Sequence, residues 1–170
     1  MGLPSTWTVN RKSVERAVAT GLESIKARQA MRLSVWAAEH FYLSAESSYV
    51  EQSWDAYPFQ PAIMDAMSND AIEEVTIRKS ARVGYTKILL AFAAYNAHQR
   101  RRNQGIWQPT DEDADDFCKT ELEPMLRDVS VMADVFPTHL QRHKDNTLKQ
   151  KRFLGSVLHL RGGKAAKNYR

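Results

Sequence analysis

The segment Glu74–Lys87 places the strongest constraint on how this chain can fold. Its β-branched run, Val75–Ile77, predicts a short strand, and the residues from Lys79 to Gly84 predict a tight turn. A strongly apolar helical run follows, from Thr86 to about Arg101. A strand, a tight loop and a helix in this order are typical of phosphate-binding loops. The sequence therefore predicts an α/β fold with an anion site at the start of this helix.

The loop meets half of the usual pattern Gly-x-x-x-x-Gly-Lys-[Ser/Thr]. Gly84 and Thr86 are in place, whereas Lys79 stands at the first glycine and Tyr85 at the lysine. The positive charge is displaced rather than lost, since cations lie elsewhere in the loop, at Lys79, Arg82 and Lys87. Backbone N–H groups around Gly84 and at the start of the helix are predicted to face an anion.

Residues 1–45 are predicted to form a helical arm. Apolar residues recur at helical spacing over residues 12–30, and a second short helix is predicted over residues 33–41, with Ser34 as a candidate cap. Two interpretations stay open for the arm: a small helical unit packed on the main domain, or a docking segment for a partner. The main domain is predicted to cover residues 46–170.

Upstream of the loop, aromatic residues gather beside Gln60, at Tyr49, Trp54, Tyr57 and Phe59. Aromatic side chains are most often core, but an aromatic ring and a glutamine placed before a phosphate loop suit an adenine ring. Pro61 is predicted in the first turn of a helix, where its missing N–H does no harm.

Downstream of the loop, the chain alternates strands and helices. Residues 105–110 predict a strand stopped by Pro109, and Thr110 is a predicted N-cap for a helix over residues 111–127. Residues 146–154 and 156–160 predict two further strands. This order favours a right-handed parallel sheet with flanking helices.

Other chemistry-bearing residues have simpler explanations. The acidic run Asp111–Asp116 suits the N-terminus of its helix, and the cations of Arg100–Arg102 suit a helix C-terminus, with nucleic-acid contact as the alternative. His139 and His143 lack a third metal ligand, and Cys118 has no base nearby in sequence. With one cysteine the chain has no internal disulfide, and no apolar run approaches the ~20 residues of a membrane span.

Five blocks of the sequence resemble the large terminase subunit of lambda-type tailed phages, in order and spacing and over nearly the whole chain. They are Tyr57–Met64, Lys79–Lys87, Ile106–Asp111, Asp145–Leu148 and Gly162–Arg170. The block Lys79–Lys87 is the most specific, because it is similar to the family's deviant Walker A loop, in which the lysine sits early.

The resemblance implies a RecA/helicase-like P-loop ATPase core, ATP and Mg²⁺ as ligands, and a motor that threads viral double-stranded DNA into a capsid through its portal. The implied nucleotide site comprises Tyr49, Gln60, Lys79, Ser80, Ala81, Arg82, Val83, Gly84, Tyr85, Thr86 and Lys87. Within it, Lys79 would neutralise phosphate charge, the Thr86 hydroxyl would meet Mg²⁺, and Tyr49 and Gln60 would lie near the adenine. The N-terminal helices would bind the small terminase subunit, in the cytoplasm of the bacterial host and without a membrane.

The chain departs from the family in length and in its carboxylates. Family members carry a later strand ending in Asp-Glu and then a nuclease domain, and the nearest substitute here, Val129–Asp134, is too polar and lacks the second carboxylate. The catalytic groups that phosphoryl transfer requires stay unassigned. We therefore expect a truncated motor domain that binds ATP weakly and turns it over poorly on its own. The alternative is a non-catalytic prophage remnant that binds the small subunit or DNA; with a net charge of +4, the chain permits a polyanionic partner without requiring one.

Overall fold

The computed structural model describes residues 14–15, 18, 31–48 and 50–169. The chain divides into two compact units, Met1–Ala30 and Met31–Arg170. In the first unit, the described residues 14, 15 and 18 are helical. The rest of the helix predicted over residues 12–30 lies outside the described residues, as does Tyr49.

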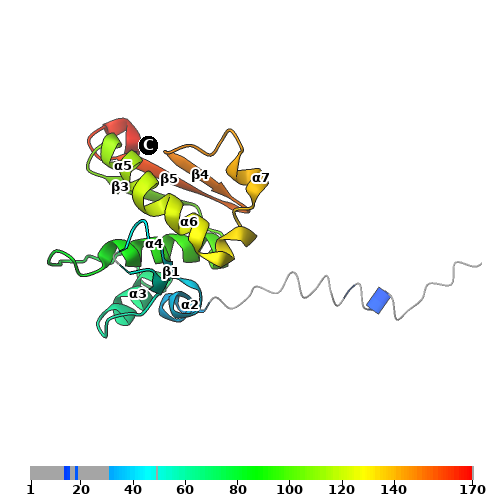
Figure 1. The fold of residues 1–170 in the computed structure, drawn as a ribbon, viewed down its shortest axis with the longest axis horizontal. Coiled ribbons are helices and arrows are strands. Elements are labelled where there is room, and N and C mark those ends of the chain that lie inside the picture. Colours follow the sequence, from blue (N-terminus) through cyan, green and yellow to red (C-terminus); the bar gives the residue numbers. More distant parts are fainter. Residues whose placement is uncertain (1–13, 16–17, 19–30, 49, 170) are drawn as a thin grey trace, which may run out of the picture. The chain divides into compact units, whose positions relative to one another are not determined.

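In the second unit, three helices pack on one another beside the predicted loop (Figure 1). They are α2 (Leu33–His40), α3 (Gln60–Ser68) and α4 (Tyr85–Tyr95), and a π-helical turn, η1 (Asn96–Arg100), extends α4. Large apolar side chains fill the space between them, and Trp36, Met64 and Tyr95 are fully buried. Helix α4 begins directly after the loop, as predicted, and Pro61 lies in the first turn of α3, also as predicted.

Three strands form a sheet in the order β3-β5-β4, comprising β3 (Gln104–Gln108), β4 (Gln150–Phe153) and β5 (Ser156–Gly162). Strand β3 runs parallel to β5, with Ile106 opposite Leu160, whereas β4 runs antiparallel to β5, with Lys151 opposite Leu158. The sheet is therefore mixed: the pair β3–β5 is parallel, as predicted, and the antiparallel strand β4 corrects the prediction of a parallel sheet. The short link between β4 and β5, with Gly155 at φ +92°, permits a hairpin, and a hairpin joins antiparallel strands.

One face of the sheet is covered by a nearly continuous helical run (Figure 1). It consists of α5 (Asp111–Phe117), the π-helical η2 (Cys118–Leu122) and α6 (Glu123–Asp128). The predicted cap is confirmed: the Thr110 hydroxyl accepts from the backbone N–H of Asp113, and the Asp113 carboxylate accepts from the N–H of Thr110. This capping box fixes where the run starts.

The remaining described elements are short. Strands β1 (Tyr42–Leu43) and β2 (Gln52–Ser53) form an antiparallel pair that flanks the connection 44–51. After α6 come η3 (Ser130–Asp134), α7 (Thr138–Gln141) and, at the end of the described chain, η4 (Ala166–Tyr169).

The strand predicted at Val75–Ile77 is wrong. Residues 72–80 form no regular element, and Val75 is 36% exposed. A strand exists only where a neighbour supplies backbone hydrogen bonds, and none of the described strands pairs with this segment. The β-branched composition of the run therefore gives no strand here.

The cap predicted at Ser34 is also wrong, because α2 begins at Leu33 and Arg32 therefore occupies the cap position. The first N–H groups of α2 are satisfied from α3 instead. The N–H of Leu33 donates to Ser68 Oγ at 3.3 Å, and the N–H of Ser34 donates to Asp65 Oδ1 at 3.1 Å. A tertiary contact thus replaces the local cap.

Candidate anion-binding site at the loop 79–87

The loop turns through two residues with left-handed backbone conformation, Arg82 (φ +60°) and Gly84 (φ +76°). Gly84 is the residue immediately before α4, so the loop ends at the positive end of an 11-residue helix. Left-handed residues beside a helix N-terminus turn backbone N–H groups toward a common concavity, a geometry that suits anions. The anion site expected from the sequence pattern stays a prediction at this turn.

Gln60 supports this turn from beneath. Its side chain is fully buried, its Nε2 donates to the carbonyl oxygen of Val83 at 3.1 Å, and its Oε1 accepts from the N–H of Tyr57 at 2.9 Å. A Cβ at Gly84 would lie 2.9 Å from Gln60 Nε2. Gln60 and Gly84 are therefore fitted to each other, and the amide fixes the loop to the start of α3.

A cavity of about 570 Å³ opens beside the loop. This volume is in the range of small-molecule and cofactor sites. The connection between β1 and β2, the loop itself and the π-helical η2 all contribute to its wall. The lining residues are Leu43, Ser47, Ser48, Val50, Gln52, Tyr57, Lys79, Arg82, Val83, Gly84, Tyr85, Thr86, Lys87 and Glu121.

Two lysines at this cavity are in different situations. Lys79 is exposed, its Nζ lies 5.7 Å from the centroid of the Tyr85 ring, and its polar contact is a long 3.4 Å bond to the Ser80 carbonyl oxygen. The Lys87 side chain is only 16% exposed, and its Nζ donates to Ser47 Oγ at 2.9 Å and to Glu121 Oε2 at 2.7 Å. Lys79 is thus available to a ligand from solvent, whereas Lys87 is engaged by protein oxygens.

Most of the predicted site residues meet at this cavity. Its lining includes Lys79, Arg82, Val83, Gly84, Tyr85, Thr86 and Lys87. Ser80 lines a neighbouring, mostly apolar cavity of about 260 Å³, with Phe59, Ile63, Ile77 and Ile88. Ala81 is an exposed residue of the same turn, and Gln60 lies under it.

The aromatic residues upstream divide into two groups. Trp54 is buried and packs edge-to-face on Phe41, so it belongs to the core. Tyr57 and Phe59 stack in parallel with centroids 5.9 Å apart, and they are 60% and 50% exposed. Tyr57 lines the loop cavity.

The sequence did not predict a role for Ser47 or Glu121. Both line the cavity and bind Lys87, although they lie 40 and 34 residues from it in the sequence. Neither belongs to a motif, so no local signal could have identified them. Glu121 is carried by η2, and a π-helical turn changes the direction of its side chains relative to a regular helix.

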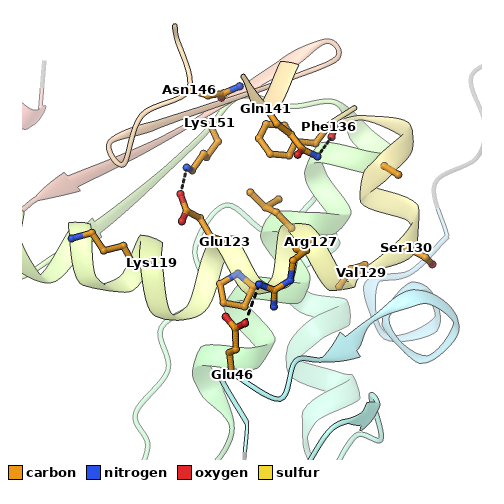
Figure 2. A pocket seen from close by; sticks show the side chains of 13 residues that line it. Glu46, Lys119, Glu123, Arg127, Val129, Ser130, Phe136, Gln141, Asn146 and Lys151 are labelled. Carbon is orange, nitrogen blue, oxygen red and sulfur yellow. Dashed lines mark hydrogen bonds and ion pairs between the residues drawn. The ribbon is translucent and has the colours of Figure 1, made fainter. Parts of the chain in front are cut away.

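A second cavity, of about 580 Å³, is lined by Glu46 of the connection 44–51 and by residues of α6 (Figure 2). Figure 2 shows two ion pairs in its wall: Lys151 with Glu123 at 2.6 Å, and Arg127 with Glu46 at 3.0 Å. Asp128 also binds Arg127, and this contact holds the pKa of the Asp128 carboxyl below its usual range. The connection is therefore tied to α6 through Glu46 and to Lys87 through Ser47.

Other candidates from the sequence have structural partners. Arg100 and Arg102 both bind Asp70, at 2.5 and 2.7 Å, and Arg100 also donates to the Ser68 carbonyl oxygen. Cys118 is fully buried, and burial raises the pKa of its thiol. In the part of the chain that the structure describes, no three His, Cys, Asp or Glu side chains are grouped to hold a metal ion, and no helix is long and apolar enough to cross a bilayer.

Comparison with known proteins gives a consistent result. Residues 47–170 match the sequence profile of the family described as phage terminase large subunit gpA, ATPase domain. The chain is 46% identical over 163 residues to the terminase large subunit of Escherichia phage lambda, covering 95% of this chain and 25% of that protein. It is 47% identical over 155 residues to the terminase large subunit of Enterobacteria phage P21, covering 91% of this chain and 24% of that protein.

A shorter match, 52% identical over 40 residues, links 24% of this chain to 21% of protein TfaD of Escherichia coli strain K12. No solved structure matches the chain. The chain spans about a quarter of the length of the two phage proteins it matches. Since the family profile covers well over half of the chain, and the described fold is the mixed α/β arrangement expected of an ATPase domain, the chain belongs to the family of phage terminase large subunit gpA ATPase domains.

Proposed function

We propose that this chain binds ATP at the loop cavity and is the nucleotide-binding part of a phage DNA-packaging motor with a RecA-like P-loop core. One observation carries the proposal: residues 82–87 frame a cavity at the N-terminus of α4, with left-handed backbone at Arg82 and Gly84. A triphosphate suits this cavity because it offers helix-end N–H groups together with lysine and arginine side chains.

The residues present fit ATP and Mg²⁺. In the proposed role, Lys79 and Arg82 would neutralise phosphate charge, the Thr86 hydroxyl would hold Mg²⁺, and Mg²⁺ would offset further phosphate charge. Thr86 is exposed and lines the cavity, which supports this role. Tyr57 supplies an exposed ring for the base, and the roles predicted for Tyr49 and Gln60 near the adenine stay part of the proposal.

Gln60 acts in this proposal through the loop. Both of its described hydrogen bonds are to backbone groups, so its main contribution is to hold Val83 and Gly84 in shape. The domain division proposed from the sequence, a helical arm to residue 45 and an ATPase domain from residue 46, also stays a proposal. In it, the arm binds the small terminase subunit, while the longer protein acts on viral double-stranded DNA at the capsid portal in the host cytoplasm.

Thermal unfolding with ATP and Mg²⁺ tests the proposal. A ligand at a hundred times its dissociation constant adds about 2.7 kcal/mol to the free energy of unfolding. We expect stabilisation of the wild type and little or none of Lys79→Ala. Lys144→Ala, which removes an exposed lysine that does not line the cavity, is the matched control and should respond like the wild type. Equal responses from all three proteins would contradict the proposal.

A further inference from the structure

Lys87 follows the proposed phosphate loop directly, yet its ammonium group is bound by the protein. The ammonium donates to the hydroxyl and to the backbone carbonyl oxygen of Ser47, and it forms a 2.7 Å ion pair with Glu121. All three residues line the loop cavity. A cation that faces an anion site is therefore held by a carboxylate at the wall of the same site.

We propose that Glu121 is a positioning residue that lowers the anion affinity of the cavity by holding Lys87 against the connection 44–51. This inference rests on the proposed function. A polyphosphate in the cavity competes with Glu121 for the Lys87 ammonium. When the ammonium turns to phosphate, it leaves Ser47 as well, so anion binding loosens the connection between β1 and β2.

The burial of the pair makes this competition significant. The side chains of Lys87 and Glu121 are 16% and 25% exposed, so solvent and salt screen them less than a surface pair. Among the lining residues of the described cavity, Glu121 is the acidic one, and its charge also repels a phosphate directly. The two effects have the same sign, and a test must separate them.

Replacing Glu121 with glutamine keeps the shape and removes the charge. We expect Glu121→Gln to bind ATP at least about threefold more tightly than the wild type, because the Glu121 carboxylate no longer competes with phosphate for the Lys87 ammonium. The gain should shrink from ATP to ADP to AMP as phosphates are removed, a trend that a merely structural role would not produce. Glu123→Gln is the matched control. Glu123 lies two residues after Glu121, does not line the loop cavity and pairs with Lys151 at 2.6 Å, so this substitution removes an ion pair elsewhere and should leave ATP affinity unchanged.

A double-mutant cycle of ATP binding with Lys87→Met separates the effect of Glu121 on Lys87 from direct repulsion between Glu121 and phosphate. If Glu121 acts through Lys87, Glu121→Gln gives a much smaller gain in ATP affinity in the Lys87→Met background than in the wild type. An equal gain in both backgrounds, or no gain in the wild-type background, would overturn the inference while leaving ATP binding at the loop intact. Absence of ATP binding by the wild type would overturn the proposed function and this inference with it.

Discussion

The buried side chain of Gln60 donates a hydrogen bond of 3.1 Å from its amide to the carbonyl oxygen of Val83, and this bond fixes the loop on α3. The two residues are 23 positions apart, so the bond also ties the connection that follows α3 back to the first residue of α3. A loop held from beneath keeps its shape before a ligand arrives, which reduces the ordering cost of binding. Two substitutions test this support.

Gln60→Leu should lower the free energy of unfolding by about 1–3 kcal/mol, because the Val83 carbonyl oxygen and the Tyr57 N–H lose a buried partner. ATP affinity should fall as well. Urea unfolding and ATP titration measure the two effects. Gln104→Leu, which removes an amide bond to the Ala93 carbonyl oxygen at 3.0 Å away from the loop, is the control for loss of stability alone. Unchanged stability of Gln60→Leu would contradict the role of this bond.

Gly84→Ala places a Cβ 2.9 Å from Gln60 Nε2, at a φ of +76° that disfavours side chains. We expect the free energy of unfolding to fall by about 1–2 kcal/mol and ATP-induced stabilisation to be lost. Gly163 directly follows β5, away from the loop, and a Cβ there would meet Tyr169 Oη at 3.0 Å. Gly163→Ala therefore controls for a general effect of adding a methyl group. A Gly84→Ala protein with wild-type stability would show that the loop does not need this conformation.

Thr110→Ala removes the hydroxyl that accepts the Asp113 N–H at 3.0 Å. Loss of an N-cap of this kind costs about 1 kcal/mol of protein stability. Chemical denaturation should show this loss, and Thr110→Ser should recover most of it because serine keeps the acceptor. A Thr110→Ser protein as unstable as Thr110→Ala would contradict the capping explanation.

Asp70 should make stability depend on pH. Hydrogen bonds from Arg102 and Arg100 lower the pKa of the Asp70 carboxyl from 3.8 to about 2 in the folded protein. A carboxyl whose folded pKa is depressed stabilises the fold above its unfolded pKa and loses this contribution as the pH falls through the folded pKa. Asp70→Asn should therefore be less stable than the wild type at pH 7, and the difference should shrink between pH 4 and about pH 2.

Denaturation of both proteins across this pH range measures the effect. Asp145→Asn is a comparison carboxylate, since Asp145 pairs with Arg152 at 2.8 Å away from Arg100 and Arg102. A difference between wild type and Asp70→Asn that stays constant to pH 2 would contradict the assignment to this ion-pair cluster.

Local patterns predicted much of the fold. The apolar run after the loop became α4, Thr110 capped the helix that follows β3, and Pro109 stopped that strand, since each signal acts within a few residues. The strand at Val75–Ile77 failed because strand formation depends on a neighbour that a local pattern does not specify. The cap at Ser34 failed because α3 supplies Asp65 and Ser68 from 31 and 35 residues away.

The same distinction applies to the candidate site. The sequence pattern identified residues of the loop itself, because phosphate loops have a fixed spacing, and most of them line the cavity. It could not identify Glu121 or Ser47, which reach Lys87 only through the packing of η2 and of the connection 44–51 on α4. Gln60 was noted for an adenine ring, and the structure adds a contact with the loop backbone that no spacing rule predicts.

Amide hydrogen exchange with and without ATP and Mg²⁺ tests the central claim most directly, because it locates the ligand along the chain. The account predicts slower exchange over residues 79–88 on binding, with no comparable change at β4 or at α6 beside the second cavity. Lys79→Ala should abolish this protection under the same conditions. Protection that appears at α6 or nowhere, with residues 79–88 unchanged, would contradict the claim that this loop holds the nucleotide.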